Sequence, residues 1–256
     1  MPFKPIQSEK LSQSVAHQIE KLILRGILRP GERLPSEREL SERMGVSRPS
    51  LRKAVADLQS RGLLQSRASA GIFVSDSLGS TFPPALTDLF SNHDEAAFDY
   101  LDFRRDMEGL AGERAARLGS DTDLQVINAI FEKMQAAHPK KDPENEAALD
   151  AEFHLAIVEA SHNVIMLHMM RSMFDLLRQG VFYNRQVMFN QNTTRHALLD
   201  QHRAINDALQ IRDPVGTRAA IDRHLAYVGT ALTDQQKADH NESVARLRLE
   251  QEKARS

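Results

Sequence analysis

The fold of the N-terminal third is decided by residues 34–74, which read LPSERELSERMGVSRPSLRKAVADLQSRGLLQSRASAGIFV. Ser36 is a good N-cap and Glu39 follows three residues later, which is typical of a capping box at the start of a helix. Gly45 can adopt a positive φ and end that helix, and Ser47 is placed to cap a second one. Two short helices separated by one glycine predict a helix-turn-helix unit, and the residues that follow predict a two-stranded wing.

The second helix of this unit is expected to bury Leu51, Val55 and Leu58 and to end at Gly62. Its first turns present a polar and basic face. Residues at the start of a recognition helix meet base edges in the major groove, where an arginine can bond a guanine as a fork. Serines at a helix N-terminus suit phosphate groups. The candidate DNA contacts on this helix are Ser47, Arg48, Ser50, Arg52 and Lys53.

A solvated basic face on a small helical domain is the simpler alternative for this region. The order of cap, turn, glycine and wing argues against it, and so does the distribution of charge. Residues 1–76 carry 13 Lys and Arg against 8 Asp and Glu, whereas the remainder carries 20 against 27. A basic head joined to an acidic body fits a DNA-binding module followed by a domain with another role.

The composition also excludes several classes of protein. The 256 residues include no cysteine, which excludes disulfides and thiolate metal sites. The first residues lack the apolar segment of a signal peptide, and no apolar run reaches the ~18 to 20 residues needed to span a bilayer. We therefore expect a cytoplasmic protein that has no membrane partner.

Helical periodicity and turn residues divide the chain into four regions of a mainly α protein. A winged helix-turn-helix domain is expected over 1–76, with its first helix over about 11–25, and a Gly-, Pro- and Ser-rich linker over 77–94. Residues 95–232 predict an antiparallel all-helical bundle, and 233–256 form a polar tail. The helices expected in the bundle lie near residues 98–107, 124–134, 149–160, 164–189, 198–209 and 215–232.

Four side chains of the bundle form a candidate metal set. Asp150 and His154 are four residues apart, so both project from one face of a helix. His202 and His224 lie on later predicted helices. One carboxylate and three imidazoles suit Zn, Ni, Mn or Fe and leave coordination positions for water or a ligand carboxylate. The alternative is an exposed polar pair in a chain of ten histidines, because an Asp-xxx-His spacing alone is a weak motif.

The run RPGERLPSERELSERMGVSRPSLRKAVADLQSRGLL, residues 29–64, resembles the winged-helix domain of GntR-type bacterial transcription regulators. This resemblance implies base contacts from the matching arginines Arg38, Arg48 and Arg52. It also implies that the wing approaches DNA with Arg67 and Gly71, at a tip that keeps one glycine.

Four later runs, LDFRRDMEGLAGERAA, DAEFHLAIVEASHN, DQHRAINDAL and DRHLAYV, resemble the helical effector-binding FCD domain of the FadR branch of that family. This resemblance implies that Asp150, His154, His202 and His224 hold a divalent metal, Zn first, and that Arg104 faces the carboxylate of a small acid. Within the branch, SRPSLRKAV, SLGSTF, FHLAIVEASHN and MFDLL are similar to regulators of lactate utilisation and of the pyruvate dehydrogenase complex, which implies lactate, pyruvate or a similar acid as effector.

Together these observations predict a metabolite-responsive transcription regulator and not an enzyme. We expect a homodimeric repressor that binds a palindromic operator in double-stranded DNA, with effector binding coupled to DNA binding. Two alternatives stay open. One is a metalloenzyme acting on a small carboxylic acid, since such a metal set can activate water. The other is a regulator whose metal is purely structural.

Overall fold

The computed structural model of the chain describes residues 8–67, 70–79, 82–93, 95–178 and 192–255. The chain divides into two compact units, Met1–Pro83 and Pro84–Ser256, and each is described by itself. In the described residues, no helix is both long enough and apolar enough to cross a bilayer.

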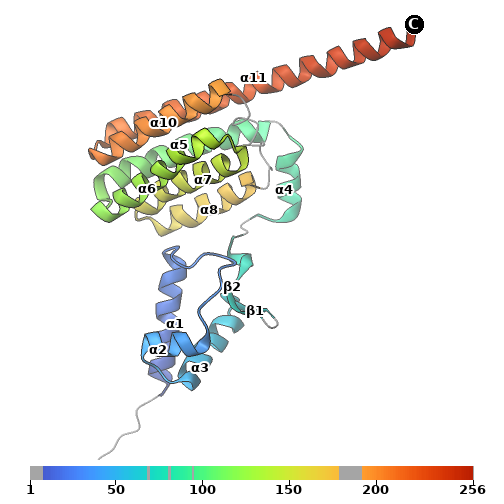
Figure 1. Cartoon of the computed structure of the whole chain (residues 1–256). Helices are drawn as coiled ribbons and strands as arrows, with labels where there is room; N and C mark the ends of the chain where they lie inside the picture. Colours follow the sequence, from blue (N-terminus) through green and yellow to red (C-terminus); the bar gives the residue numbers. More distant parts are fainter. Residues whose placement is uncertain (1–7, 68–69, 80–81, 94, 179–191, 256) are drawn as a thin grey trace, which may run out of the picture. The chain divides into compact units, whose positions relative to one another are not determined.

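The first unit is a winged helix-turn-helix, as predicted (Figure 1). Its core is formed by one face of each helix and the inner face of the wing, and it includes Val15, Ile19, Leu51, Leu58 and Val74. The two strands pair antiparallel, with Leu64 opposite Val74. Its elements are α1 (Ser8–Leu24), α2 (Glu37–Met44), α3 (Arg48–Ser60), β1 (Leu64–Arg67), β2 (Gly71–Val74) and the 3-10 helix η1 (Asp76–Gly79).

The helix boundaries of this unit follow from its capping residues. The Ser36 hydroxyl accepts the backbone N–H of Glu39 at 3.3 Å, and Gly45 ends α2 with φ +63°. Ser47 caps α3. The expected capping box differs in one respect, because the Glu39 carboxylate accepts from Arg43 at 2.6 Å instead of returning to the cap. The exposed i,i+4 arginine competes successfully for that carboxylate.

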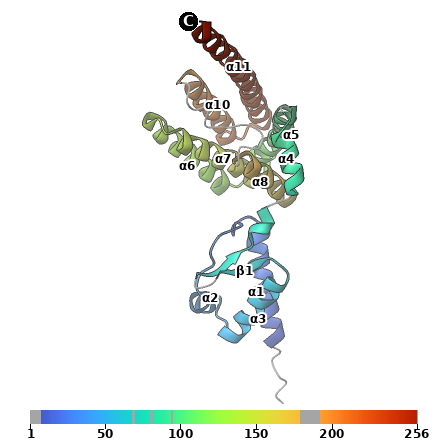
Figure 2. The same ribbon diagram turned by 90° about the vertical axis from the view of Figure 1, so that its right-hand side faces the viewer.

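The second unit is a bundle of helices, so the prediction of a mainly α protein is confirmed. Figures 1 and 2 show α5, α6, α7, α10 and α11 side by side, and the tightest packing joins α5 to α11, α10 to α11 and α6 to α7. Its elements are α4 (Pro84–Ser91), α5 (Glu95–Leu118), α6 (Asp121–Ala137), the 3-10 helix η2 (His138–Lys140), α7 (Pro143–Ala160), α8 (Val164–Arg178), α10 (Asn192–Gln210) and α11 (Pro214–Arg255).

Small residues let α11 approach α5 closely. A Cβ atom on Gly112 would lie 2.4 Å from Cδ1 of Ile221, and one on Gly109 would lie 3.2 Å from Oδ1 of Asp222. This close packing brings the segment of α11 that carries His224 next to the segment of α5 that carries Glu108.

The helix expected over 164–189 is described as α8 to Arg178, and residues 179–191 lie outside the described part of the chain. The expected linker 77–94 contains α4. The polar segment 233–255 continues α11 as one helix of 42 residues, because no Pro or Gly interrupts it and pairs such as Glu242–Arg246 at 2.8 Å support it.

Candidate functional site

The start of α3 presents the predicted recognition surface to solvent. Arg48 is exposed there and Arg38 is exposed on α2, and neither guanidinium lies in an ion pair with any residue that the structure describes. Arg52 differs, because its Nε donates to the Glu37 carboxylate at 2.8 Å. Arg38 and Arg48 are therefore available at the surface, whereas Arg52 is engaged by a carboxylate of its own unit.

Two serines and a lysine complete this surface. Ser47 Oγ accepts the backbone N–H of Ser50 at 3.4 Å, and the two hydroxyl oxygens lie 2.9 Å apart. Ser47 therefore caps the helix and engages Ser50, while Lys53 is exposed on the same helix.

The wing carries the last two predicted DNA contacts. Arg67 and Gly71 are exposed and flank residues 68–69, which lie outside the described residues. Arg67 donates to the Asp76 carboxylate at 2.7 Å, and its guanidinium lies 4.3 Å from the centre of the Phe73 ring. Arg67 is thus engaged within the wing itself.

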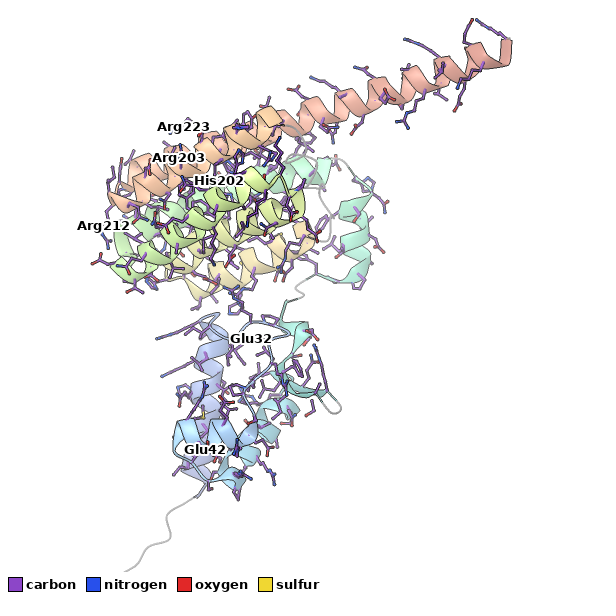
Figure 3. All side chains as sticks on the ribbon, in the orientation of Figure 1. Glu32, Glu42, His202, Arg203, Arg212 and Arg223 are labelled. Carbon is purple, nitrogen blue, oxygen red and sulfur yellow. The ribbon has the colours of Figure 1, made fainter. Side chains whose placement is uncertain are left out.

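The bundle brings together the four predicted metal ligands. Asp150 and His154 extend from α7, His202 from α10 and His224 from α11, and each side chain offers one ligand atom within 4.8 Å of the others. None of them is more than 3% exposed. His202, labelled in Figure 3, lies inside the bundle. The alternative of an exposed polar pair is wrong, since the helix face that carries Asp150 and His154 is turned into the core.

The ligand atoms of three of these side chains converge closely. Nε2 of His202 lies 2.9 Å from Oδ1 of Asp150 and 3.2 Å from Nε2 of His154, and the last atom lies 3.7 Å from the same carboxylate oxygen. The Phe153 ring packs edge-on against both imidazoles. Nitrogen lone pairs and a carboxylate that meet in so dry a position are stabilised by a cation between them.

Neighbouring groups select the tautomer that a metal requires. Nδ1 of His154 lies 2.6 Å from Oε2 of Glu108, although the angle between them is not that of an ideal hydrogen bond. Nδ1 of His224 lies 3.0 Å from Oε1 of Gln201. An acceptor beside Nδ1 places the proton there and leaves the lone pair on Nε2. The chemistry of these residues therefore fits a divalent ion.

Arg104 is fully buried on α5, one turn before Glu108. Its Nε donates to Oε1 of Glu108 at 2.5 Å, and its guanidinium lies near the rings of Tyr100 and Phe174. Burial by itself raises the pKa of Glu108, but the neighbouring Arg104 and His154 outweigh burial and lower that pKa to about 2. Glu108 is thus an anion near neutral pH, and it joins Arg104 to a candidate metal ligand.

Two comparisons by sequence place the chain in a family. Residues 11–74 match the model of bacterial regulatory proteins of the gntR family, and residues 99–227 match the FCD domain. The chain is 36% identical over 238 residues to the putative L-lactate dehydrogenase operon regulatory protein of Escherichia coli K12, covering 90% of each chain. It is 35% identical over 237 residues to the Glc operon transcriptional activator of the same strain, covering 90% of this chain and 92% of that one.

The chain belongs to the GntR family, with an FCD domain. It is a DNA-binding transcription regulator. Membership of this family argues for a regulator and against the alternative of a metalloenzyme. Among solved structures, Streptococcus agalactiae GntR is similar with a TM-score of 0.54 and 25% identity, covering 85% of this chain and 98% of that one.

This GntR-family chain also contains site residues that the sequence patterns did not identify. Glu108 lies four residues after Arg104, so helical spacing could have predicted that pair. Nothing in the sequence singled out Gln201 as the partner of His224. A second buried pair, Arg195 and Glu146, lines a cavity of about 20 Å³ together with His202, which is room for one water molecule.

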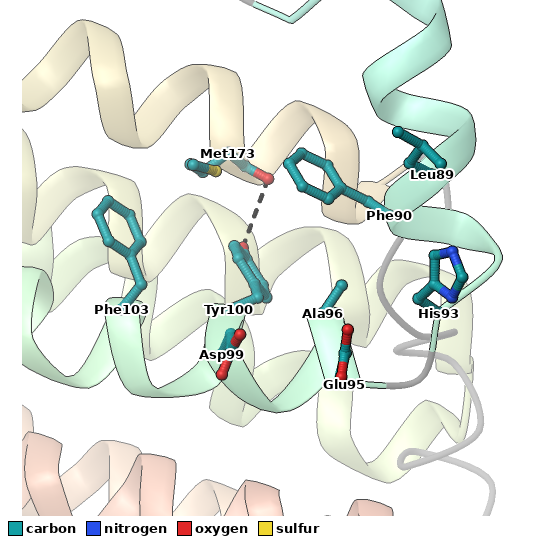
Figure 4. Close-up of a pocket in the computed structure, with 9 residues that line it drawn as sticks. All are labelled: Leu89, Phe90, His93, Glu95, Ala96, Asp99, Tyr100, Phe103 and Met173. Carbon is teal, nitrogen blue, oxygen red and sulfur yellow. Dashed lines mark hydrogen bonds between the residues drawn. The ribbon is translucent and has the colours of Figure 1, made fainter.

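A larger pocket of about 370 Å³ opens between α4, α5 and α8 (Figure 4). It is mostly apolar, and Glu95 and Asp99 contribute carboxylates to its lining. Tyr100 lines it and donates to the backbone oxygen of Met173 at 3.4 Å, while the ring of Tyr100 also lies near Arg104. The open pocket and the buried site thus share one aromatic side chain.

Proposed function

We propose that this regulator is a homodimeric, metabolite-responsive repressor that senses a small 2-hydroxy or 2-oxo monocarboxylate, L-lactate first, in the FCD domain. The observation that carries the proposal is the buried set of Asp150, His154 and His202 linked through Glu108 to Arg104. The names of the two relatives, a putative L-lactate dehydrogenase operon regulatory protein and a Glc operon transcriptional activator, support a small hydroxy acid.

The charges of the buried residues favour a monoanion. Arg104 and Glu108 carry opposite charges that balance each other, and Asp150 adds one carboxylate to the candidate ligands. A divalent ion, Zn first, would supply two positive charges and coordination positions for the effector's oxygens. The resulting surplus of one positive charge is neutralised by one carboxylate, whereas a dicarboxylate would leave an unpaired charge in a dry site.

Arg104 is suited to hold that carboxylate. A guanidinium has five N–H donors in a planar fork, so its bond to Glu108 through Nε is compatible with a second, bidentate partner. A molecule of so few atoms needs both the cation and the arginine, because each atom of a small ligand contributes little binding free energy.

The larger pocket is a less suitable place for this effector. The carboxylates of Glu95 and Asp99 line it and repel an anion, and no Lys or Arg is among the described residues that line it. This difference in charge supports the buried site over the open one.

The proposed dimer follows from the symmetry of the operator. A palindromic operator presents two equivalent half-sites, and each needs one recognition helix. The effector then acts by favouring one arrangement of the two DNA-binding domains. Effector binding and DNA binding are thereby linked by a coupling free energy.

The test combines calorimetry with DNA binding. Zn-loaded protein is titrated with L-lactate, D-lactate, pyruvate and glycolate, and its affinity for a duplex selected from a random pool is measured with and without each acid. The proposal expects one acid to bind and to weaken DNA binding. If metal removal alters DNA binding and no acid does, the metal is purely structural and the proposed sensing is wrong.

A further inference from the structure

The sheet of the wing is extended on one side by the residues that precede α2. The backbone N–H of Leu34 donates to the carbonyl of Ile72 at 2.9 Å, and Arg33 forms an antiparallel bridge with Phe73. A short extended segment therefore lies along β2, and Arg33 belongs to the wing although it is far from it in the sequence.

Alternation places Arg33 on the outer face of this sheet. Paired residues share a face, and the residues two positions along share it too. Leu64 and Val74 occupy the inner face and are fully buried, whereas Arg33 is exposed. The side chains that the register assigns to the outer face are Arg33, Gln65, Arg67 and Phe73, with Gly71 beside them.

The two arginines of this outer face differ in their partners. Arg67 is tied to Asp76, whose carboxylate also accepts from Gln65 at 2.6 Å. Arg33 has no carboxylate within ion-pair distance among the residues that the structure describes. Of the two positive charges, the one on Arg33 is therefore not compensated within the wing.

Gly71 leaves room for this arginine. Nε of Arg33 lies 3.3 Å from the position that a Cβ atom on residue 71 would occupy, which is tighter than an ordinary contact. Gly71 also has φ +108°, a conformation that side chains disfavour. The long side chain of Arg33 thus lies against a bare stretch of backbone near the tip of the wing.

We propose that Arg33 is a DNA-phosphate contact of this protein, and that Arg67 chiefly holds the wing together. The proposal rests on the proposed use of α3 and the wing as the DNA-binding surface. An uncompensated guanidinium gains a phosphate without losing an internal partner, whereas Arg67 must first give up Asp76. Because phosphates carry no sequence information, Arg33 adds affinity to all sequences equally.

The test measures binding of the full-length protein by fluorescence anisotropy over a salt series from about 50 to 200 mM. The probes are the selected duplex and a scrambled duplex of equal length. We expect Arg33→Ala to reduce the salt slope by about 1.8, because each subunit of the proposed dimer loses one phosphate contact, and to weaken both duplexes roughly 30- to 100-fold near 0.1 M salt. Arg33→Lys should retain most of the slope, and Arg67→Ala should change it less than Arg33→Ala does.

Two controls separate this contact from other effects. Arg61→Gln removes the same charge at the other end of α3, which is about 20 Å long, and should leave the slope unchanged. Arg48→Ala should markedly reduce the preference for the selected duplex. An unchanged slope in Arg33→Ala, or an equal loss in Arg61→Gln, overturns the inference while the effect of Arg48→Ala still supports the recognition helix. If Arg48→Ala keeps the preference, the proposed DNA-binding surface itself is wrong.

Discussion

Nδ1 of His154 lies 2.6 Å from Oε2 of Glu108, and the other oxygen of that carboxylate accepts from Arg104 at 2.5 Å. One buried carboxylate thus joins a candidate metal ligand to the arginine proposed to hold the effector. A shift of either partner moves the other, because Glu108 cannot lose its charge near neutral pH. This linkage gives the metal and the effector a common structural element.

Glu108→Gln should weaken metal binding by about 10- to 100-fold, because the amide no longer fixes the proton on Nδ1 of His154. Competition with a chromophoric chelator measures the Zn affinity. Glu113→Gln is the matched control, since Glu113 lies on the same helix but pairs with Arg117 at 3.1 Å in a partly exposed position. Equal Zn affinities of the two variants would mean that Glu108 does not orient the ligand.

The purified protein should contain about one divalent ion per chain, since the four side chains form one set. His202→Ala or His224→Ala should remove the ion and lower the Tm, because a metal that binds only the folded state stabilises it. Elemental analysis and thermal scans with and without chelator measure both effects. His162→Ala is the control, since that exposed imidazole pairs with Asp123 outside the set. Wild-type protein that takes up no Zn, Ni or Mn would refute the site.

Acid should destabilise the protein through Glu108. Its pKa is about 2 in the folded protein against 4.5 without these neighbours, so its contribution to the free energy of unfolding is complete above about pH 4.5. That contribution, roughly 3 kcal/mol, is lost as the pH falls toward 2. Urea denaturation of metal-free protein over this range should give a flatter pH dependence for Glu108→Gln than for wild type. Parallel curves would contradict the linkage.

Sequence patterns could predict the helices and the four candidate ligands. Gly45 and Ser47 fix the turn between α2 and α3 through local backbone chemistry, and the spacing of Asp150 and His154 fixes a shared helix face. Local rules succeed there because the residues that decide the outcome are near in sequence.

The partners of these residues were harder to predict, because the tertiary fold selects them. Gln201 meets His224 only through the packing of α10 on α11. Arg33 meets Gly71 across 38 positions only because the chain before α2 pairs with the wing. Counting charges shows a basic surplus in residues 1–76. A count cannot show which arginine has an ion-pair partner in the folded protein and which does not.

Arg48→Ala should cost about 1 to 3 kcal/mol of specific DNA binding per half-site if its guanidinium forks a guanine. Arg52→Ala should cost less, because wild-type Arg52 must first leave Glu37. Glu37→Gln should then tighten binding, since it releases Arg52 and removes a negative charge from the surface. Gel shifts at fixed salt measure the three variants. Weaker binding by Glu37→Gln would indicate that Glu37 positions Arg52 for DNA instead of restraining it.

Binding of the effector is expected to depend on Arg104. Arg104→Ala would leave Glu108 as an unpaired buried charge, at a cost of about 3 to 5 kcal/mol, and the variant risks unfolding. Arg104→Lys keeps the charge but loses the planar fork. It should therefore retain its fold and its Zn while binding L-lactate or pyruvate at least tenfold more weakly, which calorimetry measures. Arg105→Lys is the control, because Arg105 pairs with Asp102 in an exposed position.

The same titrations decide whether charge selects the ligand. If the buried site requires one negative charge, L-lactate should bind wild type and malate should bind far more weakly, although malate shares the hydroxyl and the adjacent carboxylate. DNA affinity without effector should be equal in wild type and Arg104→Lys, because Arg104 lies in the helical unit and not in the head. Equal binding of malate and L-lactate would show that a second carboxylate finds a partner, for which Arg195, paired with Glu146 at the cavity beside His202, is a candidate. Equal binding of L-lactate by wild type and Arg104→Lys would remove Arg104 from the effector site altogether.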